Sequence, residues 1–259
     1  MACHLPGNLQ HHVAAGLGLL ALLLPSNHLF ADEANGSGFV EANILAVFYH
    51  ELGHAVIDVE AVPIFGQEED AADNFSIFLI DALFQDEVAQ AFAYDASFGF
   101  LVEAELRAEL GEDAVWWGVH GPDEQRFYNT VCLFYGASPE TREQFALDME
   151  LPPERAETCA EEYDQANQSW GAVLDELSQR GGGTSLSFAS DEPGFATEII
   201  RSEVEYLNSE FTLAAPIAVT VEDCGEPNAF YDPSHRLIVF CTEFEDHLHD
   251  LEQRLFSES

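Results

Sequence analysis

The chain has 259 residues, of which 48 are acidic and only 8 are basic, and its formal net charge at pH 7 is −40. A chain this acidic is repelled by the phosphates of nucleic acids and by anionic membrane surfaces, which excludes both as partners. All of the basic residues are arginines. The acidity fits either adaptation to high salt or an acidic surface on an extracellular protein, and the sequence does not choose between them.

Residues 1–31 are predicted to be a signal peptide that is cleaved after Ala31. They contain an apolar run of 12 residues, 13–24, which is short for a membrane span, followed by Pro25. Because the usual basic residues before such a run are absent, an uncleaved membrane anchor is the alternative. Residues 32–259 fit a single domain, and the leader predicts that this domain is secreted or periplasmic.

The first predicted helix, residues 39–59, is mostly apolar and carries the HExxH sequence His50-Glu51-Leu52-Gly53-His54. Two histidines four residues apart on a helix face one way, so they can occupy two corners of a tetrahedral Zn²⁺ site. Glu51 lies about 100° further round the helix, where it can act as general base on a metal-bound water. This arrangement is typical of zinc metallopeptidases, but so short a motif also arises by chance, and a third ligand is required.

The second predicted helix, residues 68–84, supplies that ligand. A turn at residues 63–66 precedes it, and acidic residues crowd its first turn, where the helix dipole favours them. Glu69 and Asp73 share a face, so we assign Glu69 as the third ligand and Asp73 as the acceptor of a ligand histidine's N–H. Glu68 is the competing candidate for the ligand. The plainer alternative is that this stretch is only the acidic start of a helix.

Further helices are predicted at residues 86–110, 123–135 and 153–179. A loop with two tryptophans separates the first two and leads to His120, which is our candidate donor to the oxyanion of the reaction. A structural role for this loop histidine is the alternative, and Arg126 and Tyr231 are reserve candidates. For Arg126, a buried partnership with a carboxylate is the simpler interpretation.

Glycines 181–183 form a linker between a helical part, residues 39–180, and a strand-containing part, residues 184–259. The second part is predicted to hold a helix at 192–208, strands at 216–221 and 237–241, and a closing helix at 243–256. His247 and His249 face apart on the closing helix and are interpreted as surface residues. The expected fold is therefore α+β and mainly helical, with a small sheet or hairpin contributed by the C-terminal segment.

Four cysteines follow the leader, and an even number in an exported chain indicates disulfides. Of the three possible connectivities we favour Cys132–Cys159 and Cys224–Cys241, which join neighbours in the sequence. Each bond closes a loop of a few tens of residues and stabilises the fold by about 3 kcal/mol in the chain-entropy model. A four-cysteine zinc site would need closely spaced cysteine pairs, and the sequence has none.

Three blocks of the sequence resemble an uncharacterised bacterial family of metallopeptidase-like proteins, a gluzincin-like domain of unknown function. The first block runs from residue 48 to 73 and includes HExxH and Glu69. The others are residues 120–136 and 224–241. The resemblance implies a zincin-like fold and zinc-peptidase chemistry, without naming a substrate.

A zincin-like fold needs a sheet edge beside the metal-binding helix, where an extended substrate can pair. Too few residues precede the 39–59 helix to form that sheet. In related gluzincins an Asn-Ala-Phe segment precedes the metal helix, whereas here Asn228-Ala229-Phe230 follows it. We interpret this order as a circular rearrangement joined at the three glycines. It predicts that the closing helix packs near the start of the 39–59 helix.

These observations predict a zinc-dependent peptidase with His50, His54 and Glu69 as ligands, acting on a peptide or protein substrate. Glu51 would take a proton from the zinc-bound water and pass it to the leaving amine. Two alternatives stay open, namely a zinc hydrolase of a non-peptide amide and a non-catalytic secreted binding protein that keeps the zincin fold. The presence of Glu51 argues against the second.

Overall fold

A computed structural model describes residues 38–257, which lie within one compact unit. The predicted signal peptide, residues 1–31, lies outside the described residues. In the described part of the chain, no helix has the length and apolar character needed to cross a membrane. The fold is α+β and mainly helical, as the sequence predicts, with one small mixed sheet.

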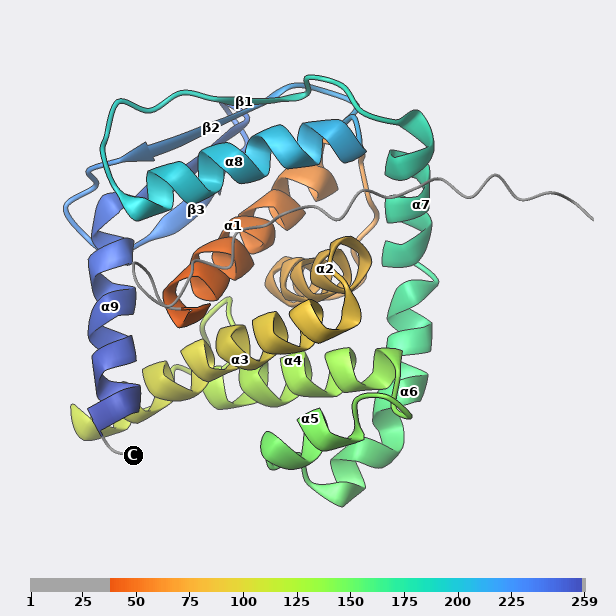
Figure 1. The fold of residues 1–259 in the computed structure, drawn as a ribbon, viewed down its shortest axis with the longest axis vertical. Helices are drawn as coiled ribbons and strands as arrows, with labels where there is room; N and C mark the ends of the chain where they lie inside the picture. The colour runs from red at the N-terminus through yellow and green to blue at the C-terminus, as the bar shows by residue number, and fades with distance from the viewer. Residues whose placement is uncertain (1–37, 258–259) are drawn as a thin grey trace, which may run out of the picture. The chain divides into compact units, whose positions relative to one another are not determined.

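Helix α1 (Gly38–Val59) forms the centre of the core, and 16 of its 22 residues are buried. A helix that is buried nearly all round must be enclosed by other elements. Helices α2 (Glu68–Leu83) and α3 (Asp86–Glu109) pack against it, and α4 (Asp123–Ala137) packs against both. The sheet and α8 (Phe195–Glu210) also contact α1, so that α1 lies between the sheet and the other helices (Figure 1).

Three helices complete the helical part, α5 (Glu143–Asp148), α6 (Pro153–Asn167) and α7 (Trp170–Arg180). The sequence predicts a single helix over residues 153–179, and this prediction is wrong. The chain bends at Gln168 and Ser169 and then starts a second helix. The bend directs Trp170 into the core, where its ring lies 5.0 Å from that of Phe75. Burial of this large aromatic side chain stabilises the bent path over a straight helix.

The sheet has the strand order β1-β2-β4-β3 and is built from short strands. Strand β1 (Leu186–Phe188) runs parallel to β2 (Ile217–Glu222), and α8 makes the crossover that parallel neighbours require. Strand β2 alternates buried residues with more exposed ones, so one face of this strand packs on the core, whereas four of the five residues of β4 are buried. Helix α9 (Thr242–Ser257) follows β4 (Leu237–Cys241) directly.

The expected pairing of the strands around residues 217 and 241 as a hairpin is not what the structure shows. Strands β2 and β4 are parallel neighbours, and the antiparallel partner of β4 is β3 (Ala229–Asp232), within the segment that the sequence suggested was a connection. The reversal between β3 and β4 is a tight turn in which Asp232 accepts from the Ser234 N–H and Arg236 has a positive φ. Strand β3 is thus an edge strand.

The order of elements agrees with the interpretation of a rearranged chain. Edge strand β3 contacts α1, and α9 also packs against α1. Side chains from the N-terminal half of α1 and from α9 line the same cavity. Two of the three glycines, however, are packed and do not form a free linker, because a Cβ would lie 2.6 Å from the carbonyl oxygen of Ser209 at Gly182 and 2.3 Å from Oγ1 of Thr212 at Gly183.

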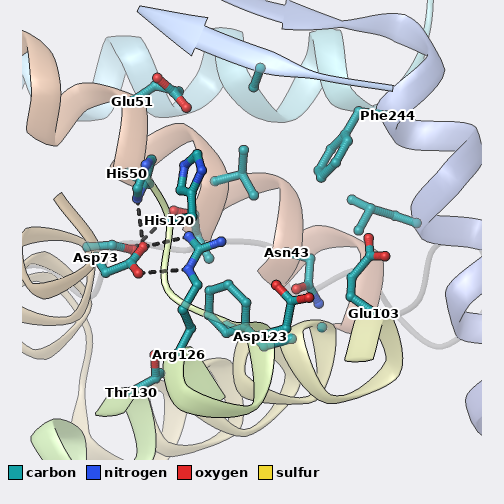
Figure 2. A pocket seen from close by; sticks show the side chains of 18 of the residues that line it. Asn43, His50, Glu51, Asp73, Glu103, His120, Asp123, Arg126, Thr130 and Phe244 are labelled. Atoms are coloured by element: carbon teal, nitrogen blue, oxygen red, sulfur yellow. Dashed lines mark hydrogen bonds and ion pairs between the residues drawn. The ribbon is translucent and has the colours of Figure 1, made fainter. Parts of the chain in front are cut away.

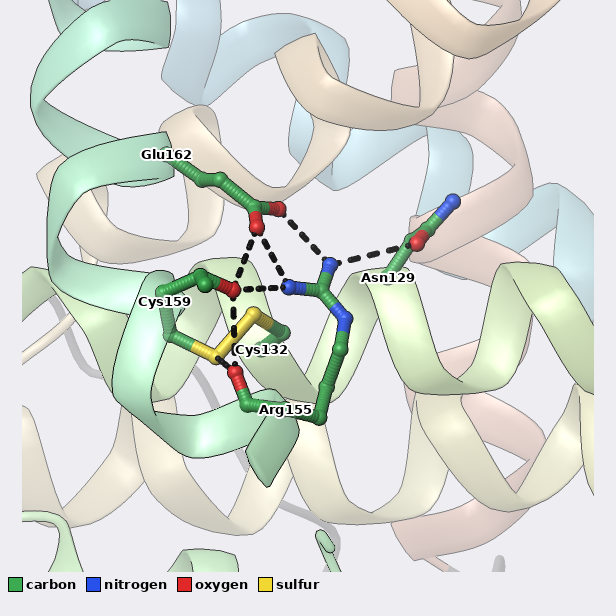
Figure 3. The surroundings of a disulfide bond; sticks show 6 residues. Asn129, Cys132, Arg155, Cys159 and Glu162 are labelled. Carbon is green, nitrogen blue, oxygen red and sulfur yellow. Dashed lines mark hydrogen bonds and ion pairs between the residues drawn. A yellow bond between two sulfur atoms is a disulfide. The ribbon is translucent and has the colours of Figure 1, made fainter. Parts of the chain in front are cut away.

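Both predicted disulfides are present. Cys132–Cys159 joins α4 to α6, and Cys224–Cys241 joins the segment before β3 to the end of β4. Beside the first bond, Arg155 donates to both carboxylate oxygens of Glu162 at 2.5 and 2.7 Å (Figure 3). Disulfides persist in oxidising surroundings, so these two indicate an extracellular or periplasmic location.

Gly136 allows α4 and α6 to approach closely, and we predict that Gly136→Ala destabilises the fold. A Cβ at this position would lie 2.2 Å from the carbonyl oxygen of Cys159, which the disulfide holds in place. The overpacking should outweigh the gain in helix propensity and lower the free energy of unfolding by about 1–2 kcal/mol. Urea unfolding without reductant measures this change.

Gly66→Ala is the matched control, since nothing lies within 4 Å of a Cβ there. Its free energy of unfolding should stay within about 0.5 kcal/mol of the parent protein. Equal stability of both variants would contradict the packing argument.

Candidate metal centre

Helices α1 and α2 bring the predicted ligands together because they pack unusually closely. A Cβ on Gly53 would lie 3.1 Å from the Cα of Ala72, so the glycine inside the HExxH motif permits this approach. As a result Glu69 of α2 reaches the face of α1 that carries His50 and His54. All three side chains are largely buried, with 9%, 13% and 21% of the His50, His54 and Glu69 side chains exposed.

The three ligand atoms form a nearly equilateral triangle. The Nε2 atoms of His50 and His54 are 3.2 Å apart, and each lies 3.2 Å from Oε2 of Glu69. In a tetrahedral site with bonds of about 2.0–2.1 Å, neighbouring ligand atoms are about 3.3 Å apart. The triangle therefore has the size of one face of such a tetrahedron, and its fourth corner is left for water or substrate.

The second nitrogen of each ring is bound to a carboxylate. Nδ1 of His50 lies 2.7 Å from Asp73, and Nδ1 of His54 lies 2.9 Å from Glu68. Because a carboxylate accepts, each Nδ1 donates, and the Nε2 of a neutral ring then presents a lone pair to the centre of the triangle. Three electron-rich atoms facing one point need a cation between them or additional ring protons.

The surrounding charges favour positive charge at this point. Burial lowers the pKa of His50, but its bonds to Asp73 and Glu69 and the charge of Glu51 outweigh burial and raise the pKa to about 9. Hydrogen bonds from His120, His50 and His54 hold the pKa of Glu69 far below its ordinary value. Nitrogen and carboxylate donors that are arranged in this way fit a divalent metal ion.

Asp73 is held in turn by Arg126 on α4. The guanidinium donates through Nε and Nη2 to the two carboxylate oxygens, both at 2.8 Å (Figure 2). Burial raises the pKa of Asp73, but the charge and hydrogen bonds of Arg126 and the contact with His50 outweigh burial and keep it well below its ordinary value. Asp73 therefore stays ionised and fixes the orientation of the His50 ring.

Glu51 lies beside the triangle and is itself buried, with 8% of the residue exposed. Burial raises its pKa, whereas the nearby His50 and His54 and a hydrogen bond from the Tyr231 backbone lower it, and the net pKa is above the ordinary value. Glu51 lines two cavities, one of about 300 Å³ and one of about 540 Å³. It is thus reached from both cavities although most of its surface is covered.

The structure brings His120 to the site and engages both reserve candidates elsewhere. Nε2 of His120 lies 2.8 Å from Oε2 of Glu69, and about half of its side chain is exposed. Arg126 is occupied with Asp73, while the hydroxyl of Tyr231 donates to Asp58 at 2.7 Å.

Comparison with known proteins agrees with this geometry. A family model described as "Putative metallopeptidase" matches residues 26–174 and 195–258 of the chain. The chain belongs to this family. No curated protein and no solved structure matches it. The metallopeptidase family indicates a hydrolase that uses a metal ion, and the three-residue group on α1 and α2 is where such an ion fits.

For this family member, sequence reasoning selected every residue of the triangle, and the structure separates Glu69 from its competitor. Glu68 turns to the outer side of His54 and is 53% exposed, whereas Glu69 faces both histidines. The buried partnership expected between Arg126 and a carboxylate is confirmed, with Asp73 as a partner that the sequence did not identify, and the bond from the Tyr231 backbone to Glu51 was missed. Both join residues far apart in the sequence, and no local pattern signals them.

We predict that Asp73→Asn weakens metal binding by about 10–100-fold, which is the usual effect of losing the acceptor of a ligand histidine. The amide would hold the His50 ring less firmly and would leave Arg126 without its counter-charge. Competition with a chelator of known affinity measures the dissociation constant. Glu68→Gln is the comparison, and its effect should be smaller because water can replace an exposed carboxylate. An unchanged constant for Asp73→Asn would contradict the assigned role.

Proposed function

We propose that the protein is a zinc-dependent metallopeptidase that hydrolyses peptide bonds. The observation that carries the proposal is the triangle of two imidazole nitrogens and one carboxylate oxygen with 3.2 Å sides, with Glu51 beside it. Two nitrogen ligands and one oxygen ligand with a fourth position open are the usual donor set of a catalytic Zn²⁺. When bound there, Zn²⁺ would polarise the scissile carbonyl and make water a better nucleophile.

The residues around the triangle supply the remaining chemistry. Glu51 accepts a proton from the attacking water and then donates it to the leaving amine, a role that suits a carboxylate whose pKa is raised by burial. His120 donates from Nε2 to the oxyanion that forms at the scissile carbonyl, since this nitrogen already points to the ligand atom of Glu69.

Strand β3 provides the wall along which an extended peptide lies. It is the edge strand of the sheet, and residues 228–231 line the cavity of about 540 Å³ together with Glu51, His54 and Glu69. A peptide that pairs with this edge has its backbone next to Glu51. This arrangement supports peptides over small amides as the substrate. The net charge of −40 further disfavours acidic partners, nucleic acids included.

Export is the last part of the proposal. The disulfides require oxidising surroundings, and we infer that residues 1–31 act as a signal peptide that sends the enzyme to the periplasm or out of the cell.

Glu51→Gln should lower peptide cleavage by about 10²–10⁴-fold without loss of bound zinc, because the amide cannot accept a proton. The measurement is cleavage of a mixed peptide library by the zinc-loaded parent and variant proteins, with metal content determined on both. Equal cleavage by the two proteins would rule out Glu51 as the base. Absence of cleavage by the parent, together with hydrolysis of simple amides, would favour a non-peptide amide hydrolase.

His120→Ala should lower kcat by about 10²–10³-fold, as expected for the loss of one donor to the oxyanion, and change KM little. The contact of His120 with Glu69 also allows a purely structural role, which would appear as weaker zinc binding. Steady-state kinetics with saturating zinc separates the two, since a structural role predicts recovery of the parental kcat.

A further inference from the structure

The cavity of about 300 Å³ runs from the metal centre into the space between α1, α3, α4 and α9. It begins at His50, Glu51 and His120, so a group bound at the triangle faces its entrance (Figure 2). Ligand pockets have volumes of about 300–1,000 Å³, which places this one at the lower end of the range. It has room for one long side chain of a larger substrate.

Most of the wall is apolar. It is formed by residues of α1, α2, α3 and α9, among them Ala46, Val47, Ile77, Phe100, Phe244 and Leu248. Such a wall contacts the methylene groups of a bound side chain and leaves few hydrogen-bonding groups along the path.

Asn43, Glu103 and Asp123 make the far end of the cavity polar, and all three present acceptor oxygens (Figure 2). The amide nitrogen of Asn43 is already used, because it donates to the carbonyl oxygens of Phe39 and Asp95 at 2.9 and 3.0 Å. Burial raises the pKa of Asp123, the charges of Arg107 and Arg126 and the hydrogen bond from Arg107 lower it, the charge of Glu103 raises it, and the net pKa is above the ordinary value.

The cations that balance these carboxylates lie outside the cavity. Glu103 contacts Nε2 of His247 at 2.5 Å, and Asp123 accepts from Arg107, but neither cation lines the cavity. Among the described residues, Arg126 is the only arginine in the lining, and both carboxylate oxygens of Asp73 engage it. Each carboxylate has further acceptor positions beyond the one that its partner occupies, so the far end offers acceptor atoms to whatever enters.

We propose that this cavity binds the side chain of a lysine or arginine next to the scissile bond of a peptide substrate. The proposal rests on the proposed peptidase function and specifies its substrate class. The apolar wall would cover the aliphatic stem, and Glu103 and Asp123 would accept charge-assisted hydrogen bonds from the cationic head. An uncharged stem of equal length would contact the apolar wall but make no hydrogen bond to the remaining acceptor positions of the carboxylates, and an acidic side chain would be repelled.

Matched peptides that differ at one position test this proposal. The position carries lysine, norleucine or glutamate, and norleucine retains the stem while lacking the ammonium group. With the zinc-loaded protein, kcat/KM should be roughly tenfold or more higher for lysine than for norleucine, and lowest for glutamate. The ratio of lysine to norleucine should fall by about the same factor in Glu103→Gln and in Asp123→Asn.

Glu105→Gln is the matched control, because Glu105 is exposed and lies on the opposite face of α3 from Glu103. It removes the same charge from the same helix and should leave the ratio unchanged. Glu103 lies within α3, six residues before its end, whereas Asp123 begins α4 close to His120, so Glu103→Gln tests the cavity with the least disturbance of the loop that carries His120.

Binding of the same peptides to Glu51→Gln, measured by fluorescence anisotropy with and without Zn²⁺, separates the cavity from the chemistry. The lysine peptide should bind more tightly than the norleucine peptide, and this difference should be lost in the double variant Glu51→Gln/Glu103→Gln. Such a result supports the cavity even when no peptide is cleaved, because the absence of cleavage counts only against the peptidase proposal. Equal binding of lysine and norleucine peptides, or a preference that both cavity variants retain, overturns the inference.

Discussion

The close contact between α1 and α2 is the constraint on which the site depends. At Gly53 the two helices approach so closely that a Cβ would lie 3.1 Å from the Cα of Ala72 and would have to push the neighbouring helix outward. A wider separation would move Glu69 away from both histidines and break the 3.2 Å triangle. Because α1 is buried on nearly all sides, the elements around it hold this spacing, and the ligands are part of the core.

Charged side chains behind this contact hold the histidines in place. Asp73 is shared between His50 and Arg126, so one buried carboxylate orients a ligand and anchors α4 to α2. The chain has only eight arginines for 48 acidic residues, and one of the eight is paired with Asp73. This pairing is therefore a specific feature of the site. A guanidinium suits the role, since it stays protonated and binds both oxygens of a carboxylate at once.

The sequence predicts the parts of this site that depend on residues close together in the chain, and it does not predict those that depend on residues far apart. His50, His54, Glu69 and Asp73 could be selected because helical spacing fixes their relative directions within two neighbouring helices. Periodicity did not show strand β3, since four residues carry too little of it and its pairing with β4 is decided by tertiary contacts, and only the resemblance of Asn228-Ala229-Phe230 to a gluzincin segment pointed to an edge there. The cavity could not be predicted for the same reason, as its wall combines helices from both ends of the chain.

The hydrogen bonds between β3 and β4 decide which residues of β3 direct their backbone groups to the open edge of the sheet. The carbonyl of Asn228 accepts from Cys241 on β4, so Ala229 and Tyr231 direct their backbone groups to the open edge. Their two N–H groups are engaged within the protein, by the side chain of Asn228 and by Glu51. The backbone groups of these two residues that remain available on the open edge are therefore their carbonyl oxygens. A strand added here must donate its own N–H groups to them, which fixes its register against Glu51 and against the triangle of His50, His54 and Glu69.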